Sequence, residues 1–120
     1  MSDASPNAPF ADLRKLSPKV TGGLIRMREA AYADGLLPGK HKLLTALAIS
    51  VALRCEPCLN AYARLARDRG ATEPELIEFL NVAITMQGCP GEDWAAKALA
   101  AFRQPVAPEQ GSPPASCCKP

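Results

Sequence analysis

Residues 43–53, LLTALAISVAL, form an apolar run that is interrupted only by Thr45 and Ser50. Its 11 residues are too few to span a bilayer as a helix, which takes about 20. A buried strand is one interpretation, but the length of the run and its alanines and leucines favour a helix over about 40–54. A helix that is apolar on nearly all sides is buried in a larger core or in an oligomer.

Helix start and stop signals flank this run on both sides. Ser17 and Pro18 match an N-cap followed by a proline at the first helical position. Pro57 fits the first turn of a later helix, and Thr72 and Glu75 match a capping box. The predicted helices cover residues 19–34, about 40–54, 57–69, 73 to near 88, and 92 to about 104. The first of them places four apolar residues on one face: Val20, Leu24, Met27 and Ala31.

The chain of 120 residues predicts one domain. Residues 1–16 contain two prolines and no sustained period, so we expect a flexible N-terminal arm. Residues 17–104 form the helical domain. Residues 105–120 are rich in proline and predict a disordered tail that carries two cysteines. With no alternating strand pattern, the fold class is all-α, a bundle of about five helices.

Composition excludes several classes of function. A net charge of +2 is too small for a nucleic-acid-binding surface, and an aromatic content of 5% does not favour base stacking. The N-terminus lacks the basic and apolar regions of a secretory signal, so we expect a cytoplasmic protein that does not bind membranes. Thiols in the cytoplasm are mostly reduced, and a Cys-x-x-Cys pair there is more often catalytic or metal-binding than a structural disulfide.

Cys55 and Cys58 form such a pair at the predicted start of a helix, with Pro57 stiffening the turn between them. The macrodipole and the N–H groups of a helix N-terminus favour a thiolate. Arg54 acts in the same direction and Glu56 opposes it. The alternatives are redox chemistry, inert packing of small apolar side chains, and metal binding, for which zinc would need four ligands.

The segment KHKLLTALAISVALRCEPCLNAYARLARDRGATEPELIEFLNVAITMQG resembles the carboxymuconolactone decarboxylase and alkylhydroperoxidase AhpD-like family, from about residue 36 to 102. The resemblance implies an all-α homo-oligomer, a trimer or hexamer. Its redox members reduce peroxides or exchange disulfides through a Cys-x-x-Cys pair without a bound cofactor, taking electrons from a thiol donor. Other members lack both cysteines and decarboxylate a lactone, so the pair places this chain with the redox branch.

By the same resemblance, Cys58 is the attacking thiol, Cys55 the resolving thiol and Tyr62 a hydrogen-bonding neighbour. Redox members carry a relay glutamate twelve residues before the first cysteine and a relay histidine four residues after the second. These positions hold Leu43 and Tyr62 in this chain. Tyrosine, with a reference pKa near 10, is a poor base at neutral pH, and loss of a general base lowers the rate by about 10²–10⁴-fold.

Two alternatives to an enzyme stay open at the level of sequence. A soft metal or metalloid (mercury, copper or arsenite) is one possible ligand, with five candidate thiolates: Cys55, Cys58, Cys89, Cys117 and Cys118. The other is a structural homologue that has lost its activity. His41, the single histidine, lies 14 residues before Cys55, which is roughly 20 Å along a continuous helix. We therefore expect a surface residue rather than a base for the thiols.

Overall fold

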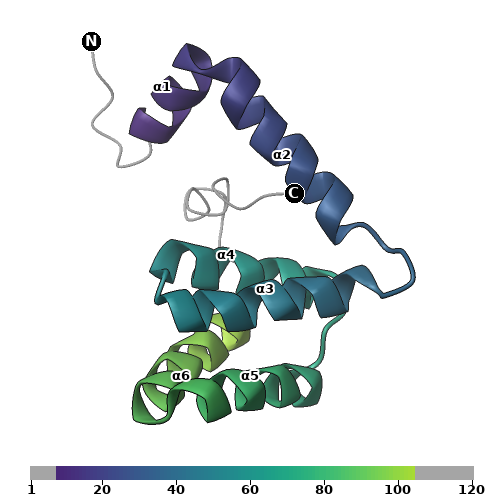
Figure 1. Ribbon diagram of the computed structural model, residues 1–120, viewed down its shortest axis with the longest axis vertical. Coiled ribbons are helices and arrows are strands. Elements are labelled where there is room, and N and C mark those ends of the chain that lie inside the picture. The colour runs from purple at the N-terminus through teal and green to yellow at the C-terminus, as the bar shows by residue number, and fades with distance from the viewer. Residues whose placement is uncertain (1–7, 105–120) are drawn as a thin grey trace.

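The computed structural model describes residues 8–104, which fold into six helices and contain no strand within that range (Figure 1). The all-α prediction is confirmed. The helices are α1 Ala8–Leu16, α2 Pro18–Tyr32, α3 Gly39–Leu53, α4 Glu56–Asp68, α5 Glu73–Gln87 and α6 Cys89–Arg103. The five predicted helices correspond to α2–α6, with ends that differ by a few residues.

Helix α3 lies at the centre of the core because it packs against α4, α5 and α6. Three of its leucines are completely buried: Leu43, Leu44 and Leu47. Ile49 and Leu53, in contrast, are 52% and 71% exposed, so the helix is not enclosed on all sides within one chain. Among the described helices, none has both the length and the apolar character that a membrane crossing requires.

Helix α1 lies within residues 1–16, the segment for which the sequence predicts a flexible arm without regular structure. Residues Ala8–Leu16 are helical, and α1 packs against α2. Pro9 suggested a break, but it lies in the first turn, where its missing N–H has no helical partner to lose. Arg14 and Lys15 in the last turn favour the helix through its dipole. Residues 1–7 and the predicted tail, 105–120, lie outside the described part of the chain.

Helix α2 extends away from the bundle of α3–α6 and contains no buried residue (Figure 1). The apolar stripe predicted from its sequence is present but faces solvent in the single chain. Val20 is 72% exposed and Met27 is 61% exposed. Amphipathic spacing thus predicted the helix correctly, although residues 8–104 bury none of its side chains.

The connection from α2 to α3 depends on Gly39. Its N–H donates a hydrogen bond of 2.5 Å to Asp34 Oδ1. A Cβ atom added to Gly39 would lie 2.6 Å from the carbonyl oxygen of Tyr32 and would overlap the guanidinium of Arg69. Only glycine allows these groups to approach, so this residue fixes the end of α2 next to the start of α3 and the end of α4.

Candidate thiol site

The site begins at the corner between α3 and α4, which we name the first corner (residues 50–58). Helix α3 ends in a Schellman arrangement, in which Arg54 N–H donates to Val51 O at 3.2 Å and Cys55 N–H to Ser50 O at 3.1 Å. Arg54 adopts a left-handed conformation, with φ 55° and ψ 43°. Within residues 8–104 it is the one non-glycine residue with positive φ. For such a residue the left-handed conformation costs about 1–2 kcal/mol.

Cys55 is the N-cap of α4, and Cys58 is the third residue of that helix. The carbonyl of Cys55 accepts the first helical hydrogen bond, from Leu59 N–H at 2.9 Å, but its side chain makes no capping hydrogen bond. Both cysteines are half-buried, and Cys58 packs against the core. Both are thiols in this structure. The start of α4 therefore holds two partly accessible thiols, three residues apart.

Tyr62 follows Cys58 by one turn, as predicted, and is only 7% exposed. Its hydroxyl lies 2.7 Å from the hydroxyl of Tyr32, and the rings meet edge to face with centroids 5.5 Å apart. Tyr32 ends α2 and was not identified from the sequence. The contact spans 30 residues, so no local pattern could reveal it. The weak signal that existed was that the chain contains just two tyrosines.

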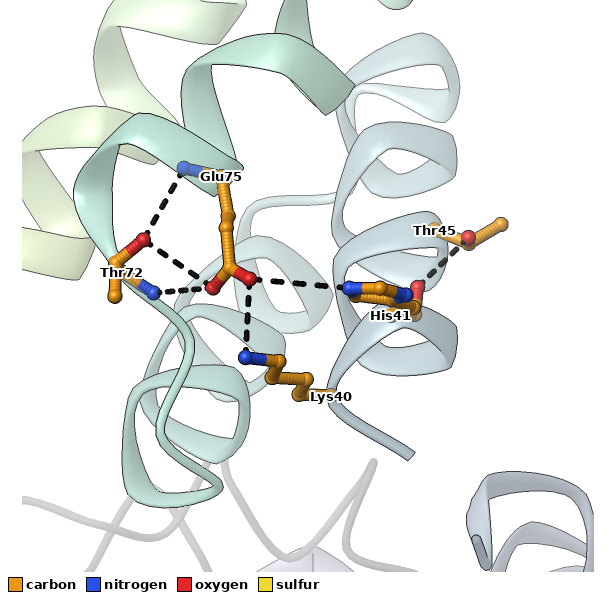
Figure 2. Close-up of polar contacts among 5 residues, drawn as sticks. All are labelled: Lys40, His41, Thr45, Thr72 and Glu75. Carbon is orange, nitrogen blue, oxygen red and sulfur yellow. Dashed lines mark hydrogen bonds and ion pairs between the residues drawn. The ribbon is translucent and has the colours of Figure 1, made fainter. Parts of the chain in front are cut away.

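Leu43 and His41, the other two residues considered for a proton relay, have other roles in the structure. Leu43 is completely buried in the core, so this position contributes packing. His41 faces α5, with its Nε2 3.8 Å from Glu75 Oε2 and its ring 5.8 Å from that of Phe79 (Figure 2). The side chain of His41 is 40% exposed, in keeping with the surface position expected from the sequence.

The second corner (residues 66–75) connects α4 to α5 and contains the predicted capping box. Glu75 N–H donates to Thr72 Oγ1 at 3.3 Å, and Thr72 N–H donates to Glu75 Oε1 at 2.9 Å (Figure 2). Lys40 Nζ lies 3.0 Å from Glu75 Oε2. The hydrogen bond from the Thr72 backbone, followed by the contact with Lys40, lowers the pKa of Glu75 to about 2.

Cys89 is the first residue of α6, and its side chain is exposed. Across residues 8–104, no three residues of the histidine, cysteine, aspartate and glutamate types come together as a metal site. The proposal that Cys89 adds a third sulfur to Cys55 and Cys58 is therefore not supported by this arrangement. Cys117 and Cys118, the other candidate thiolates, lie outside the described residues.

Comparison with known proteins identifies the family of this chain. A model of the carboxymuconolactone decarboxylase family matches residues 18–101. A crystal structure of a member of that family from Legionella pneumophila, in its apo form, is 37% identical, with a TM-score of 0.75 over 78% of this chain and 84% of that one.

Two uncharacterised relatives are similar over most of their length. One, from Cupriavidus necator, is 35% identical over 96 residues, which cover 80% of this chain and 85% of the relative. The other, encoded in the cox locus of Paracoccus denitrificans, is 27% identical over 94 residues, covering 78% and 85%. The resemblance seen in the sequence is thus confirmed, and the chain belongs to the carboxymuconolactone decarboxylase family.

Proposed function

We propose that the protein is a thiol–disulfide oxidoreductase or AhpD-like peroxidase that uses Cys58 and Cys55. The observation that carries this proposal is the placement of two partly accessible thiols at the N-cap and third position of one helix. A Cys-x-x-Cys pair at a helix N-terminus is the arrangement of many disulfide oxidoreductases, in which the two thiols close reversibly into a disulfide.

The proposed peroxide reaction proceeds in two steps. The Cys58 thiolate attacks the terminal oxygen of the peroxide, so that an S–O bond forms and the O–O bond breaks, which gives a sulfenic acid and an alkoxide that takes a proton from water to leave as the alcohol. The Cys55 thiol then attacks the sulfenic acid, which forms the disulfide and releases water. A dithiol donor returns the pair to the reduced state by disulfide exchange. With a disulfide substrate, the first step forms a mixed disulfide with Cys58 instead.

The rate of this reaction is expected to be modest. A leucine in the core stands at the relay glutamate position, and Tyr62 stands at the position of the histidine. A tyrosine hydroxyl can donate a hydrogen bond to a thiolate, but it is a poor base for removing the proton of the thiol at neutral pH. This difference favours slow peroxide reduction or disulfide exchange over rapid peroxidase turnover.

A redox titration of Cys55 and Cys58 tests the proposal directly. The full-length chain carries Cys89→Ser, Cys117→Ser and Cys118→Ser, so that mass spectrometry counts only the paired thiols. We expect a reversible two-electron couple between about −180 and −300 mV, the range of exchange dithiols. Turnover with hydrogen peroxide, an alkyl hydroperoxide and a small disulfide is then measured with a dithiol reductant.

Cys89 provides the matched control for this experiment because it also begins a helix and is followed by a proline. In the full-length chain with its other cysteines intact, Cys58→Ser should abolish turnover, and Cys55→Ser should stop it after one attack, whereas Cys89→Ser should leave it unchanged. Failure of Cys55 and Cys58 to form a disulfide at any redox potential of the titration would refute the proposal. So would equal loss of activity on replacing Cys89.

We also propose that the protein is a homo-oligomer, as the family resemblance implies. Support comes from α2, whose apolar residues Val20 and Met27 are largely exposed, and from the exposed Ile49 and Leu53 on α3. Sedimentation of the full-length protein should give the mass of several subunits. Met27→Glu, which adds a charge to the exposed apolar face, should lower that mass, whereas Glu29→Gln on the same helix should not.

A further inference from the structure

Arg54, at the first corner, adopts a backbone conformation that an arginine side chain disfavours. Its φ of 55° and ψ of 43° lie in the left-handed region, where the Cβ atom of a residue other than glycine lies too close to the following carbonyl oxygen. The equivalent position of the second corner holds Gly70, with φ 90°, and glycine is the usual residue at such helix ends. Strained backbone of this kind gathers at functional sites, so the side chain of Arg54 requires an explanation.

The positive charge of Arg54 is not compensated within residues 8–104. Arg54 is exposed, and in that range its side chain takes part in no hydrogen bond or ion pair. Arg103, in contrast, is held by Glu73 at 2.7 Å and connects the end of α6 to the start of α5. The guanidinium of Arg54 is therefore available to a group from outside the described part of the chain.

This charge stays near the thiol pair in every rotamer, because Arg54 is bonded directly to Cys55. Neighbouring Cα atoms lie about 3.8 Å apart across a trans peptide bond, and Cys58 follows in the first turn of the helix that Cys55 caps. The N-terminal end of the α4 dipole adds partial positive charge. Glu56, the acidic residue of that turn, acts in the opposite direction. A negatively charged group at the corner is thus attracted by Arg54 and repelled by Glu56.

We propose that Arg54 determines substrate specificity by favouring disulfides or hydroperoxides that carry a carboxylate near the reacting bond, an inference that rests on the proposed function of Cys58 and Cys55. The planar guanidinium matches a carboxylate through two parallel hydrogen bonds. With such a disulfide, the Cys58 thiolate attacks one sulfur, the S–S bond breaks and the first carboxylate-bearing thiolate leaves. Cys55 loses its proton to water and attacks Cys58 Sγ, which releases the second thiolate. The cysteine pair loses two electrons and the substrate gains two.

Alkylation of Cys58 tests this charge preference without turnover. The full-length chain carries serine at its four other cysteines: Cys55, Cys89, Cys117 and Cys118. Anionic iodoacetate and neutral iodoacetamide react with the same thiolate, so the ratio of their rates cancels any change in the pKa of the thiol. At 0.01 M ionic strength, Arg54→Gln should lower the iodoacetate to iodoacetamide ratio by about two- to fivefold, as expected for charges about 4–10 Å apart in water. Arg54→Lys should retain most of the ratio, and 1 M salt should remove the difference.

Two matched variants separate a local charge effect from a change in net charge. Glu56→Gln removes the opposing charge at the same corner and should raise the ratio. Lys19→Gln removes a positive charge at the start of α2, the end of that helix remote from the bundle (Figure 1), and should leave the ratio unchanged. Glutamine and arginine carry the same backbone strain at position 54, so Arg54→Gln changes the charge and keeps the corner.

A second measurement uses the intact pair, with serine at Cys89, Cys117 and Cys118. Oxidation of the reduced pair is followed with three small disulfides: anionic dithiodipropionate, neutral hydroxyethyl disulfide and cationic cystamine. The anionic disulfide should react fastest, and Arg54→Gln should reduce that preference by about two- to fivefold.

An alkylation ratio in Arg54→Gln equal to that of the parent at low salt would overturn the proposal. An equal effect of Lys19→Gln would overturn it too, as would an unchanged order of the three disulfides in Arg54→Gln. Alkylation requires no disulfide and no turnover. A pair that never oxidises would therefore refute the proposed function, while the alkylation ratio would still report whether Arg54 attracts an anion to the thiol.

Discussion

The two corners that flank α4 have the same backbone plan and different side chains. Each follows a Schellman ending and begins the next helix with Glu-Pro, in Cys-Glu-Pro-Cys at the first corner and Thr-Glu-Pro-Glu at the second. The second corner has Gly70 at the position of positive φ, with a capping box after it. The first has Arg54 at that position and no side-chain cap. Residues that favour local stability at the second corner are replaced at the first by residues suited to sulfur chemistry.

The contrast extends one turn further into each helix. Four residues after Cys58 lies Tyr62, whose hydroxyl meets that of Tyr32. Four residues after Glu75 lies Phe79, which has no hydroxyl and packs near the ring of His41. The first corner is thus followed, one turn on, by a buried hydroxyl pair. The second is followed by an aromatic ring without a polar group.

Transfer of the thiol pair to the second corner should show the largest difference between the corners. The variant carries Thr72→Cys and Glu75→Cys, with all five native cysteines replaced by serine. The proposed role of Tyr62 as a hydrogen-bonding neighbour of Cys58 has no counterpart in Phe79, so alkylation of the new thiol at position 75 at pH 7 should be about tenfold or more slower than that of Cys58. Rates equal to those of the native pair would show that helix register alone sets reactivity.

Removal of the N-cap side chain should affect the two corners unequally. Thr72→Ala should lower the free energy of unfolding by about 1 kcal/mol, because the Glu75 N–H loses its acceptor. Cys55→Ala, measured under reducing conditions, should change it by less than about 0.5 kcal/mol, since this side chain caps nothing. Urea unfolding monitored by circular dichroism measures both values. Equal losses would mean that Cys55 contributes to stability in a way that its contacts do not reveal.

Exchange of the residues at positive φ should act in opposite directions. Gly70→Ala should destabilise the fold by about 1 kcal/mol through backbone strain alone, since no atom lies within 4 Å of an added Cβ. Arg54→Gly should stabilise it by up to about 1 kcal/mol, because glycine adopts the left-handed conformation without strain. The same urea series measures both. A loss of stability in Arg54→Gly would indicate that the arginine side chain makes a compensating contact.

The smallest expected effect is a dependence of stability on acid at the second corner. The pKa of Glu75 is about 2 in the folded protein, against a usual value of 4.5, so the unfolded chain binds more protons between these values. Glu75 therefore contributes stability that is complete above pH 4.5 and is lost as the pH falls toward 2. The difference in unfolding midpoint between the parent and Glu75→Gln should shrink over that interval. A constant difference would contradict this assignment.

Local sequence signals predicted the second corner well and the first corner only in part. Thr72 and Glu75 identify a capping box because both partners lie within one turn, and the structure confirms both hydrogen bonds. The left-handed conformation of Arg54 escaped prediction because glycine, not arginine, marks such positions. The Tyr32–Tyr62 contact escaped it because tertiary packing joins residues 30 apart. Helix α1 was missed because Pro9 has opposite meanings in a first turn and in a helix interior.

The positions of Cys55 and Cys58 at the N-cap and third residue of α4 link two equilibria. A disulfide between them would be a covalent link between the N-cap and the third residue of α4. In α5, the same two positions are linked by the hydrogen bonds of Thr72 and Glu75. Folding and disulfide formation are linked in a thermodynamic cycle. The free energy by which the disulfide stabilises the folded protein therefore equals the free energy by which folding favours formation of the disulfide. For a two-electron couple, about 1.4 kcal/mol corresponds to about 30 mV. Substitutions that fray the first turn of α4 therefore shift the reduction potential without touching either sulfur.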